Sequence, residues 1–532
     1  MTTSVEREAR DAGGSRPVSG ETGRSARSGA IGLVGAAASG LFGFVLAVVI
    51  TRGYGSAGAG AFFAAIGVVT VATAICTLGA ETGIMWALPR RRRGPDGDAA
   101  RVLPVALAPP IIASVAVAVA GVIAADWLAP RLLDSSGSAG RPLIEASFSA
   151  LPVVVAMTLL LAALRCVRSI EAYVVVQFLL LPIGRPALVG VFVLVGGGVV
   201  LGMIGWLVPA VVALVTAALL VGRSLGIGRG VGLRPLRSDW RTFWGFALPR
   251  AASAAIDAGS MWVGVLMTAA LASQAEAGIF GAVGRYVLAG QLAMQGLRVA
   301  VSPQLSRLLG RGQRDEAAQV HRQMTTWSLV LSLPVYLLLA VFGLGFLQLF
   351  GPDFTSGAAA MTVLAVAMLV NVAVGNVQSL LLMGGRSGLH LSATVANVLV
   401  NLTLGFALIP GHGALGAAVA WGVGIVVENL IAAVAARRVV GHPLFTAGMA
   451  RTALIAVVAV GAASALAVTI AGQGVEGLAV ALGILAVGCV SYLTIPRVRR
   501  RLWDILKQIR GGGAGSRASA DVALGDTGMK GR

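Results

Sequence analysis

Apolar segments of about 20 residues alternate with short polar loops along most of the chain. A helix of that length crosses the ~30 Å hydrocarbon core of a membrane. The weakest boundary separates the fifth and sixth segments, where Gly196, Gly197 and Gly198 make the only break. The pattern predicts an all-α polytopic membrane protein with about fourteen transmembrane helices. They are expected at approximately 29–50, 59–82, 102–125, 146–164, 172–194, 200–221, 243–270, 277–301, 326–350, 358–383, 388–409, 414–436, 452–471 and 475–495.

Composition supports a membrane protein and excludes a soluble enzyme. The 532 residues are 57% hydrophobic and only 12% charged, whereas soluble domains are about a quarter charged. The mean hydropathy is +0.87. Three cysteines (Cys76, Cys166 and Cys489) and four single histidines lie far apart, so the sequence predicts no disulfide framework and no metal site. No hydrolase motif is present, and no cofactor is expected.

The formal net charge of +19 indicates membrane topology and not nucleic-acid binding, because the cations lie in loops between apolar segments. One side of the predicted membrane receives nearly all of them, and the other side receives only Arg52, Arg131 and Arg141. By the positive-inside rule, we expect both termini in the cytoplasm. The expected location of the protein is the plasma membrane. The basic cytoplasmic segments are expected to contact anionic lipids. The cytoplasmic cations are Arg90–Arg93, Arg101, Arg165, Arg168, Arg223–Arg241, Arg307–Arg322, Arg386, Arg437, Arg438, Arg451 and a C-terminal cluster.

Two short sequence matches indicate an internal duplication. Gly60–Ala64 and Gly278–Ala282 are similar at an offset of 218 residues, and a weaker match pairs Leu201–Trp206 with Leu415–Trp421. Duplicated lobes with a site at their interface are common in secondary transporters. We therefore expect a disordered tail (1–28), a six-helix lobe (29–221), a cytoplasmic linker (222–242), a second six-helix lobe (243–438), two extra helices (439–495) and a basic cytoplasmic tail (496–532).

Four stretches carry a resemblance to a known family. They are Arg52–Gly55 with Phe62; Ala300–Leu308 with Gly312–Glu316; Phe350–Phe354 with Ala358; and Asn397, Asn401, Leu408–Pro410, Gly413, Gly416–Ala418 and Ala420. The chain resembles the multidrug/oligosaccharidyl-lipid/polysaccharide exporter superfamily, specifically its Wzx-type oligosaccharide flippase branch. The resemblance implies a V-shaped pair of lobes with alternating access. It also implies a cargo, an oligosaccharide on undecaprenyl pyrophosphate, that moves from the cytoplasmic to the outer leaflet for surface polysaccharide biosynthesis.

Ionisable and amide residues inside the predicted helices are the candidate site. Ionisable groups at mid-membrane are costly, so they are functional hypotheses by default. Arginines suit a pyrophosphate because the guanidinium fork matches phosphate oxygens, but each arginine could instead pair structurally, Arg250 with Asp257 or Arg185 with Glu428. Asn397 and Asn401 share a helix face and could join helices or contact cargo. The substrate-binding candidates are Arg185, Arg250, Asp257, Arg285, Asn371, Asn376, Asn397 and Asn401; the candidates for a coupling H⁺ or Na⁺ are Asp257 and Glu428.

Other functions remain open at this point. A lipid II flippase of peptidoglycan synthesis and a cation-coupled multidrug exporter belong to the same superfamily. A membrane-embedded polymerase is disfavoured because the longest outer loop, about 126–145, is short. A polysaccharide polymerase complex is instead a candidate partner. By resemblance to fourteen-helix lipid II flippases, the helices at 452–471 and 475–495 are expected to form a groove for the polyprenyl tail; alternatively, they only anchor the basic segment Arg497–Arg510.

Overall fold

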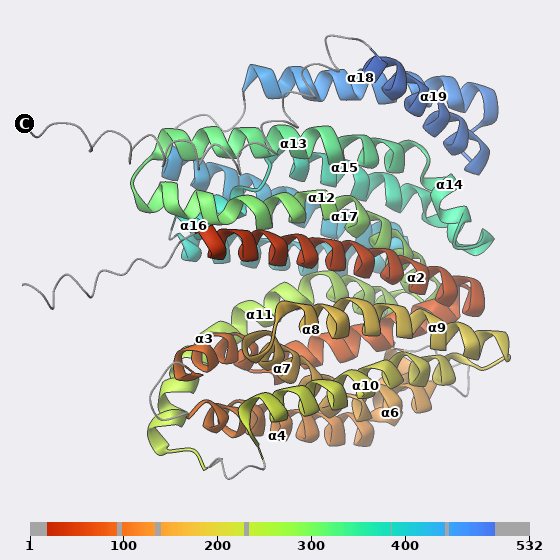
Figure 1. The fold of residues 1–532 in the computed structure, drawn as a ribbon. Coiled ribbons are helices and arrows are strands. Elements are labelled where there is room, and N and C mark those ends of the chain that lie inside the picture. Colours follow the sequence, from red (N-terminus) through yellow and green to blue (C-terminus); the bar gives the residue numbers. More distant parts are fainter. Residues whose placement is uncertain are drawn as a thin grey trace, which may run out of the picture.

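The computed structural model describes residues 19–92, 98–132, 140–227, 234–384, 386–441 and 446–494, and all regular structure in these ranges is helical (Figure 1). Most of the tails predicted at 1–28 and 496–532 therefore lies outside the described residues. The first half comprises α2 (Ser19–Cys76), α3 (Ala80–Arg92), η1 (Asp98–Arg101), α4 (Val102–Ile123), α5 (Ala125–Leu132), α6 (Gly140–Ser149), α7 (Leu151–Val167), α8 (Ile170–Val174), the π-helix η2 (Val175–Leu180), α9 (Leu181–Leu194) and α10 (Val199–Leu225). The second half comprises α11 (Arg237–Leu271), α12 (Gln274–Gly310), α13 (Arg314–Val341), α14 (Gly343–Gln348), η3 (Pro352–Gly357), α15 (Ala358–Val374), α16 (Val377–Met383), α17 (Ser387–Val440), α18 (Ala447–Ala471) and α19 (Val475–Thr494).

The prediction of an all-helical polytopic membrane fold is confirmed. Nine helices in the described ranges are long and apolar enough to cross a membrane, and Trp262–Leu271 and Val475–Ser491 are shorter apolar helices. Two of the nine spans are bent by a glycine in a non-helical conformation, Gly55 in α2 (φ 66°) and Gly413 in α17 (φ 51°). Glycine reaches positive φ without the steric penalty of a Cβ atom. Each of these two long helices therefore consists of two arms, and the total of fourteen spans stays a prediction.

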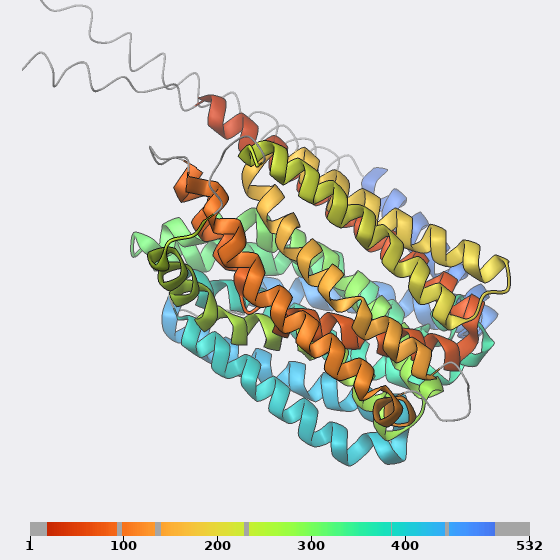
Figure 2. The same ribbon diagram turned by 90° about the horizontal axis from the view of Figure 1, so that it is seen from below.

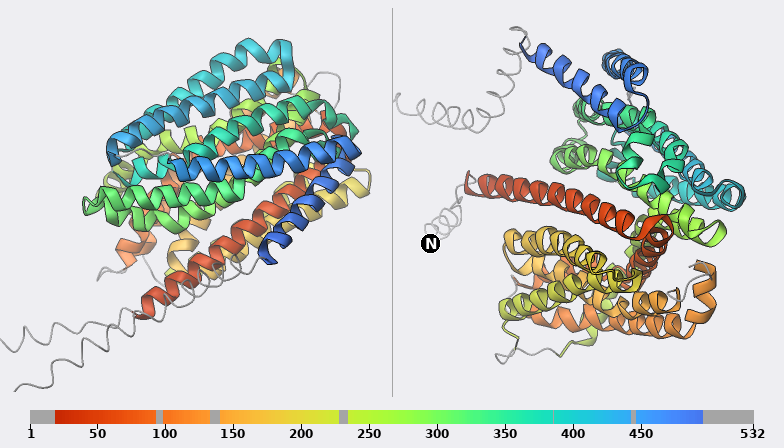
Figure 3. Two further views of the ribbon diagram at one scale, coloured as in Figure 1. Left: turned by 90° about the horizontal axis from the view of Figure 1, so that it is seen from above. Right: turned by 90° about the vertical axis from the view of Figure 1, so that its right-hand side faces the viewer.

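The helices lie in two groups joined by α2 and α11 (Figure 1). One group contains α3–α10 and the other contains α12–α17. Helix α18 packs on α13, and α19 packs on α18 and α14. Helix α2 contacts both α9 and α12, and α11 contacts α3 as well as α17. Figure 2 shows the long helices running roughly side by side, and the right panel of Figure 3 shows the first arm of α2 lying between the two groups.

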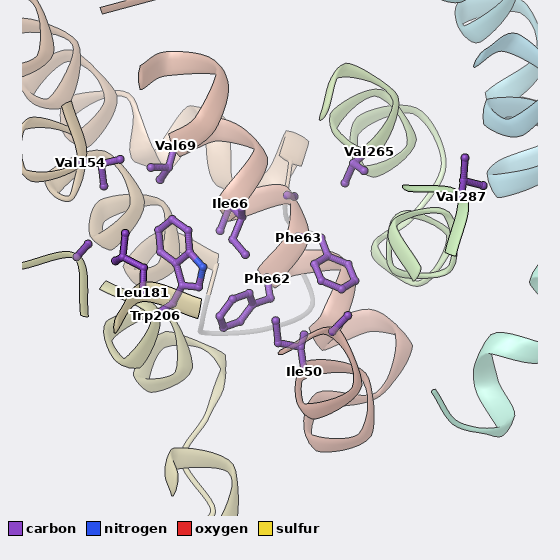
Figure 4. Packing of buried hydrophobic residues seen from close by; sticks show 14 of the residues in the cluster. Ile50, Phe62, Phe63, Ile66, Val69, Val154, Leu181, Trp206, Val265 and Val287 are labelled. Carbon is purple, nitrogen blue, oxygen red and sulfur yellow. The ribbon is translucent and has the colours of Figure 1, made fainter. Parts of the chain in front are cut away.

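The second arm of α2 is the centre of the packed core. Phe62 and Phe63 are at most 1% exposed, and Figure 4 shows them beside Ile50, with Ile66 and Val69 further along the same arm. Trp206 and Leu181 approach this core from α10 and α9. Because lipid tails are as apolar as these side chains, close packing and not water exclusion holds such helices together.

The two halves of the sequence duplication meet in the structure. An ideal Cβ on Gly60 would lie 2.9 Å from the Gly278 nitrogen and would overlap the Gln274 carbonyl; one on Gly278 would lie 2.9 Å from the Gly60 nitrogen and would overlap the Ser56 carbonyl. Gln274 and Ser56 are separated by the same 218 residues as the two glycines. The contact is therefore reciprocal, as expected for equivalent segments facing each other across a local two-fold axis.

Polar contacts reinforce the same end of the molecule. The Arg52 guanidinium donates to the backbone oxygens of Leu349 (2.9 Å) and Gln348 (3.0 Å). The Glu276 carboxylate accepts from the Ala414 nitrogen at 2.7 Å, directly after the bend of α17. That nitrogen opens the second arm, where a negative charge is favourable. At the end predicted to face the outside, α2 is thus bonded to the end of α14, and α12 is bonded to α17.

Candidate functional site

A polar cavity of about 450 Å³ lies mainly within the second group of helices. Among the described residues of its wall, only Thr70 comes from the first half of the chain; α11, α12, α15, the turn at Gly375 and Asn376, α16 and both arms of α17 supply the rest. Seven of its lining residues are carboxamides: Gln291, Gln295, Asn371, Asn376, Gln378, Asn397 and Asn429. Each carboxamide can donate and accept hydrogen bonds. The cavity wall also includes Trp262, Trp421, Arg298 and Glu428.

The Glu428 carboxylate in the cavity wall accepts three side-chain hydrogen bonds. Its side chain is 9% exposed. One carboxylate oxygen accepts from Gln378 Nε2 (3.0 Å) and Thr394 Oγ1 (3.2 Å), and the other accepts from Asn397 Nδ2 (2.6 Å). Among the described residues no cation pairs with it, so three neutral donors from α16 and the first arm of α17 compensate its burial.

The four predicted asparagines are not equivalent in the structure. Asn371, Asn376 and Asn397 line the cavity, whereas Asn401 is buried one turn further along α17 and is not part of its wall. Asn376 Nδ2 donates to the Met294 oxygen at 3.1 Å, so this amide also ties α12 to the start of α16. Asn397 likewise joins the two arms of α17 through Glu428.

The predicted arginines lie outside the cavity wall, each over an aromatic ring. The Arg185 guanidinium carbon lies 4.0 Å from the Trp206 ring centroid, and that of Arg250 lies 4.1 Å from Phe246. Arg285 lies between Phe63 (5.3 Å) and Trp262 (5.2 Å). Cations are attracted to the ring face at such distances.

The two ion pairs considered from the sequence have different outcomes. Arg185 and Glu428 do not pair, because Arg185 stacks in the first helix group while Glu428 is bonded to three neutral donors in the second. Asp257 lies in α11, but its side chain is outside the described part of the structure, as is any contact with Arg250. Its two predicted roles, in substrate binding and in ion coupling, stay predictions.

Sequence reasoning missed Thr394 as a partner of Glu428 and Asn429 as a wall residue. The spacing of Thr394, Asn397 and Asn401 places all three on one helix face, which is the available signal. Asn429 follows Glu428 directly and donates to the Ile425 oxygen at 2.8 Å. Among the described residues, no group of three or more His, Cys, Asp or Glu could hold a metal ion.

Comparisons with known proteins show which families and structures this chain resembles. The sequence model of the MatE family matches residues 249–407, which include much of the cavity wall. The solved structure of an inward-facing multidrug resistance MATE family transporter of the MOP superfamily superposes with a TM-score of 0.64 at 15% identity, over 76% of this chain and 94% of that one. The family match over residues 249–407 and the likeness of fold both relate this chain to the MOP superfamily of membrane transporters.

Two further relatives widen the comparison within the MOP superfamily. The lipid II flippase MurJ, in an inward closed conformation, has a TM-score of 0.67 at 12% identity, over 85% of this chain and 97% of that one. A probable low-salt glycan biosynthesis flippase, Agl15 of Haloferax volcanii, is 25% identical over 244 residues. That match covers 44% of this chain and 51% of the relative, so the chain spans about half the length of that flippase.

Proposed function

We propose that this MOP-superfamily transporter is a flippase for a polyprenyl-pyrophosphate-linked oligosaccharide. The observation that carries the proposal is the concentration of seven carboxamides around one cavity. Sugar hydroxyls both donate and accept hydrogen bonds, and a carboxamide offers both functions from one side chain. Such a wall can bind many sugar hydroxyls without a fixed charge pattern. Similarity to a probable glycan biosynthesis flippase supports this assignment over half of that relative's length.

Two alternative functions share this fold and differ from the proposed one in the cargo that is transported. A lipid II flippase is favoured by the likeness to MurJ, and a multidrug exporter by the likeness to MATE transporters. Both likenesses concern the fold alone, because the identities are low. A cation-coupled exporter would favour acids and aromatic faces in its cavity. This wall contains Trp262, Trp421 and Glu428, but carboxamides outnumber them.

The proposed mechanism is alternating access of two six-helix lobes, 29–221 and 243–438, in a fourteen-span protein with cytoplasmic termini at the plasma membrane. In this scheme the reciprocal glycine contact and the Arg52 bonds close the outer end. The polar cavity then opens toward the inner leaflet. When the outer contacts break, the cavity opens toward the outer leaflet. Undecaprenyl-pyrophosphate-linked oligosaccharide is the proposed cargo, and a polysaccharide polymerase complex is the proposed recipient partner.

The extra helices provide an apolar surface suited to the lipid part of this cargo. A cavity of about 760 Å³ is lined by α13, α18 and α19, with small residues such as Ala459, Ala462, Ala463 and Gly488. Small side chains leave room for a chain to lie against the backbone. We propose that the polyprenyl tail occupies it while the sugars enter the polar cavity. Glu428 is the proposed coupling site for H⁺ or Na⁺, because it is a buried carboxylate in the same wall.

The test is translocation by the purified full chain in proteoliposomes. A fluorescent undecaprenyl-pyrophosphate oligosaccharide, lipid II and ethidium are offered separately, and inward-to-outward movement of each is measured. We expect transport of the oligosaccharide lipid, reduced by Asn371→Leu, with the exposed Gln323→Leu as a matched control. Transport of lipid II alone would establish the peptidoglycan alternative. Transport of ethidium alone would establish the drug-exporter alternative and refute the proposal.

A further inference from the structure

A second polar pocket lies within the first group of helices and shares no residue with the cavity described above. It has a volume of about 130 Å³, far more than one water molecule requires. Helix α3 supplies Glu81 and Met85, α7 supplies Thr158 and Arg165, α8 supplies Tyr173 and η2 supplies Gln177. We call it the N-terminal pocket; Met157, Leu161 and Ala162 complete its wall.

The polar groups of the N-terminal pocket are largely uncommitted. Among the described residues, neither the Glu81 carboxylate nor the Gln177 amide has a hydrogen-bond partner. Arg165 lies over the Tyr173 ring at 5.6 Å, and its Nη1 is 3.9 Å from the Met85 sulfur, which is a weak acceptor. Glu81 is close enough to Arg165 for an electrostatic interaction. An acid, a cation and an amide thus converge without a described protein nitrogen or oxygen atom as hydrogen-bond partner, and Glu81 and Arg165 are exposed.

Two distortions of the helical backbone place these groups. The chain breaks between α2 and α3 at Leu78, which has φ 50°, three residues before Glu81. Positive φ is uncommon for a bulky residue and indicates local strain. Gln177, another residue of the pocket wall, lies within the π-helix η2 (Val175–Leu180). Single-turn π-helical insertions are rare in proteins, but those that occur are often found at functional sites. Two independent irregularities therefore aim side chains into one small pocket.

The chemistry of the pocket selects among ligands. Glu81 and Arg165 cancel in charge, so neither a pyrophosphate nor a metal ion finds the surplus of opposite charge that it needs. A polyprenyl chain would leave both charges unsolvated. A neutral sugar satisfies the set: its hydroxyls donate to Glu81, accept from Arg165 and do both with Gln177, while its C–H face covers the exposed part of Tyr173.

We infer that the N-terminal pocket binds one neutral sugar unit of the cargo, separately from the carboxamide-lined cavity. The inference rests on the proposed function, since it names a second contact for the same oligosaccharide. It makes cargo selection depend on two sites, one in each group of helices. Its size restricts it to a single ring.

The experiment measures protection of a cysteine placed in the pocket. Met85→Cys is introduced into the full chain after the three native cysteines are replaced by serine, and its reaction rate with a small methanethiosulfonate reagent is measured in nanodiscs. Methyl α-D-glucopyranoside, methyl α-D-mannopyranoside, methyl α-D-galactopyranoside and N-acetyl-D-glucosamine are the probes. At ten times its dissociation constant, a bound sugar should slow the reaction about tenfold. Gln177→Leu should weaken that sugar's affinity about tenfold, the usual effect of losing one hydrogen bond.

Controls keep each outcome decisive. Gln323→Leu, the same change on the exposed side of α13, should leave protection unchanged. No reaction of Met85→Cys, or no protection by any probe, overturns the inference; if the oligosaccharide lipid is still translocated, the proposed function survives that result. Protection by sodium or ethidium in place of sugars would make the pocket a cation site and also overturn the inference. Absence of both protection and translocation would overturn the inference and the proposed function together.

Discussion

Replacing Gly60 by alanine should shift the protein away from the arrangement in which α2 and α12 touch at Gly60 and Gly278. The proposed mechanism makes this arrangement the outer-closed one. The new Cβ would meet the backbone of α12 at Gly278 and Gln274, and neither group is the movable end of a side chain. Helices α2 and α12 must therefore separate on an ångström scale. Gly278→Ala should have the same effect, because its Cβ would meet the backbone at Gly60 and Ser56. Since both changes strain one contact, the double variant should cost less than the sum of the two.

The magnitude follows from ordinary overpacking. An extra methyl group in a well-packed region costs about 1–3 kcal/mol. The cost falls only on the arrangement in which the two glycines touch, so it acts as a population shift. An equilibrium between outer-closed and outer-open arrangements would move by roughly 5- to 150-fold toward the open one.

The assay is a distance measurement across the predicted outer face. Spin labels at Ser149 (α6) and Ser356 (η3) report one site in each group of helices, in a chain whose native cysteines have been replaced. Pulsed electron resonance should show a larger fraction of long distances in Gly60→Ala. Gly43→Ala is the matched control in the same helix, because its Cβ would meet no atom within 4 Å. Equal distance distributions in Gly60→Ala and Gly43→Ala would refute the reasoning.

Four further outcomes are expected. Cysteines at Ser356 and Gly312 should label from outside and inside the cell respectively, and outside labelling at Gly312 would break the proposed topology. Glu428→Gln should abolish stimulation of transport by a proton or sodium gradient while binding of the oligosaccharide lipid persists; unchanged stimulation in a transport assay would exclude Glu428 as the coupling site. Arg285→Lys should reduce polysaccharide export further than Arg185→Lys, because Arg285 stacks on a ring of the cavity wall; equal export by both would contradict this ranking. Ala463→Phe should fill the apolar cavity beside α18 and slow transport of the oligosaccharide lipid without changing expression, and normal transport would leave those helices only an anchoring role.

The fold was accessible from sequence because hydropathy and length alone select membrane-spanning helices. The bends at Gly55 and Gly413 were also within reach, because glycine is the default residue where φ turns positive. The sequence match between Gly60 and Gly278 indicated duplication but not contact. Contact requires both segments to lie beside the local axis, which only the packing of α2 on α12 determines.

The candidate site was accessible in part. Asn397 and Glu428 were each chosen from the sequence, but their hydrogen bond depends on the bend at Gly413, which folds the second arm of α17 back toward the first. Thr394 and Gln378 join the same carboxylate from positions that no spacing rule connects to Glu428. Glu81 and Gln177 are polar residues inside predicted helices, but their convergence in the N-terminal pocket was not predictable, because two backbone distortions that hydropathy does not record place these side chains.

Charge alone does not rank the three predicted arginines by their importance for transport. A guanidinium stacked on a ring keeps its N–H edges available for anions, so stacking by itself excludes none of the three. Arg185 lies on α9 against a ring of α10, within the first group of helices. Arg285 shares Trp262 with the wall of the polar cavity and also contacts Phe63 on the central arm of α2. A change in how α2 packs on α12 must therefore be felt at Arg285 directly and at Arg185 only through other helices. Of these arginines, the one that contacts both α2 and a ring of the cavity wall has the stronger claim to a role in transport.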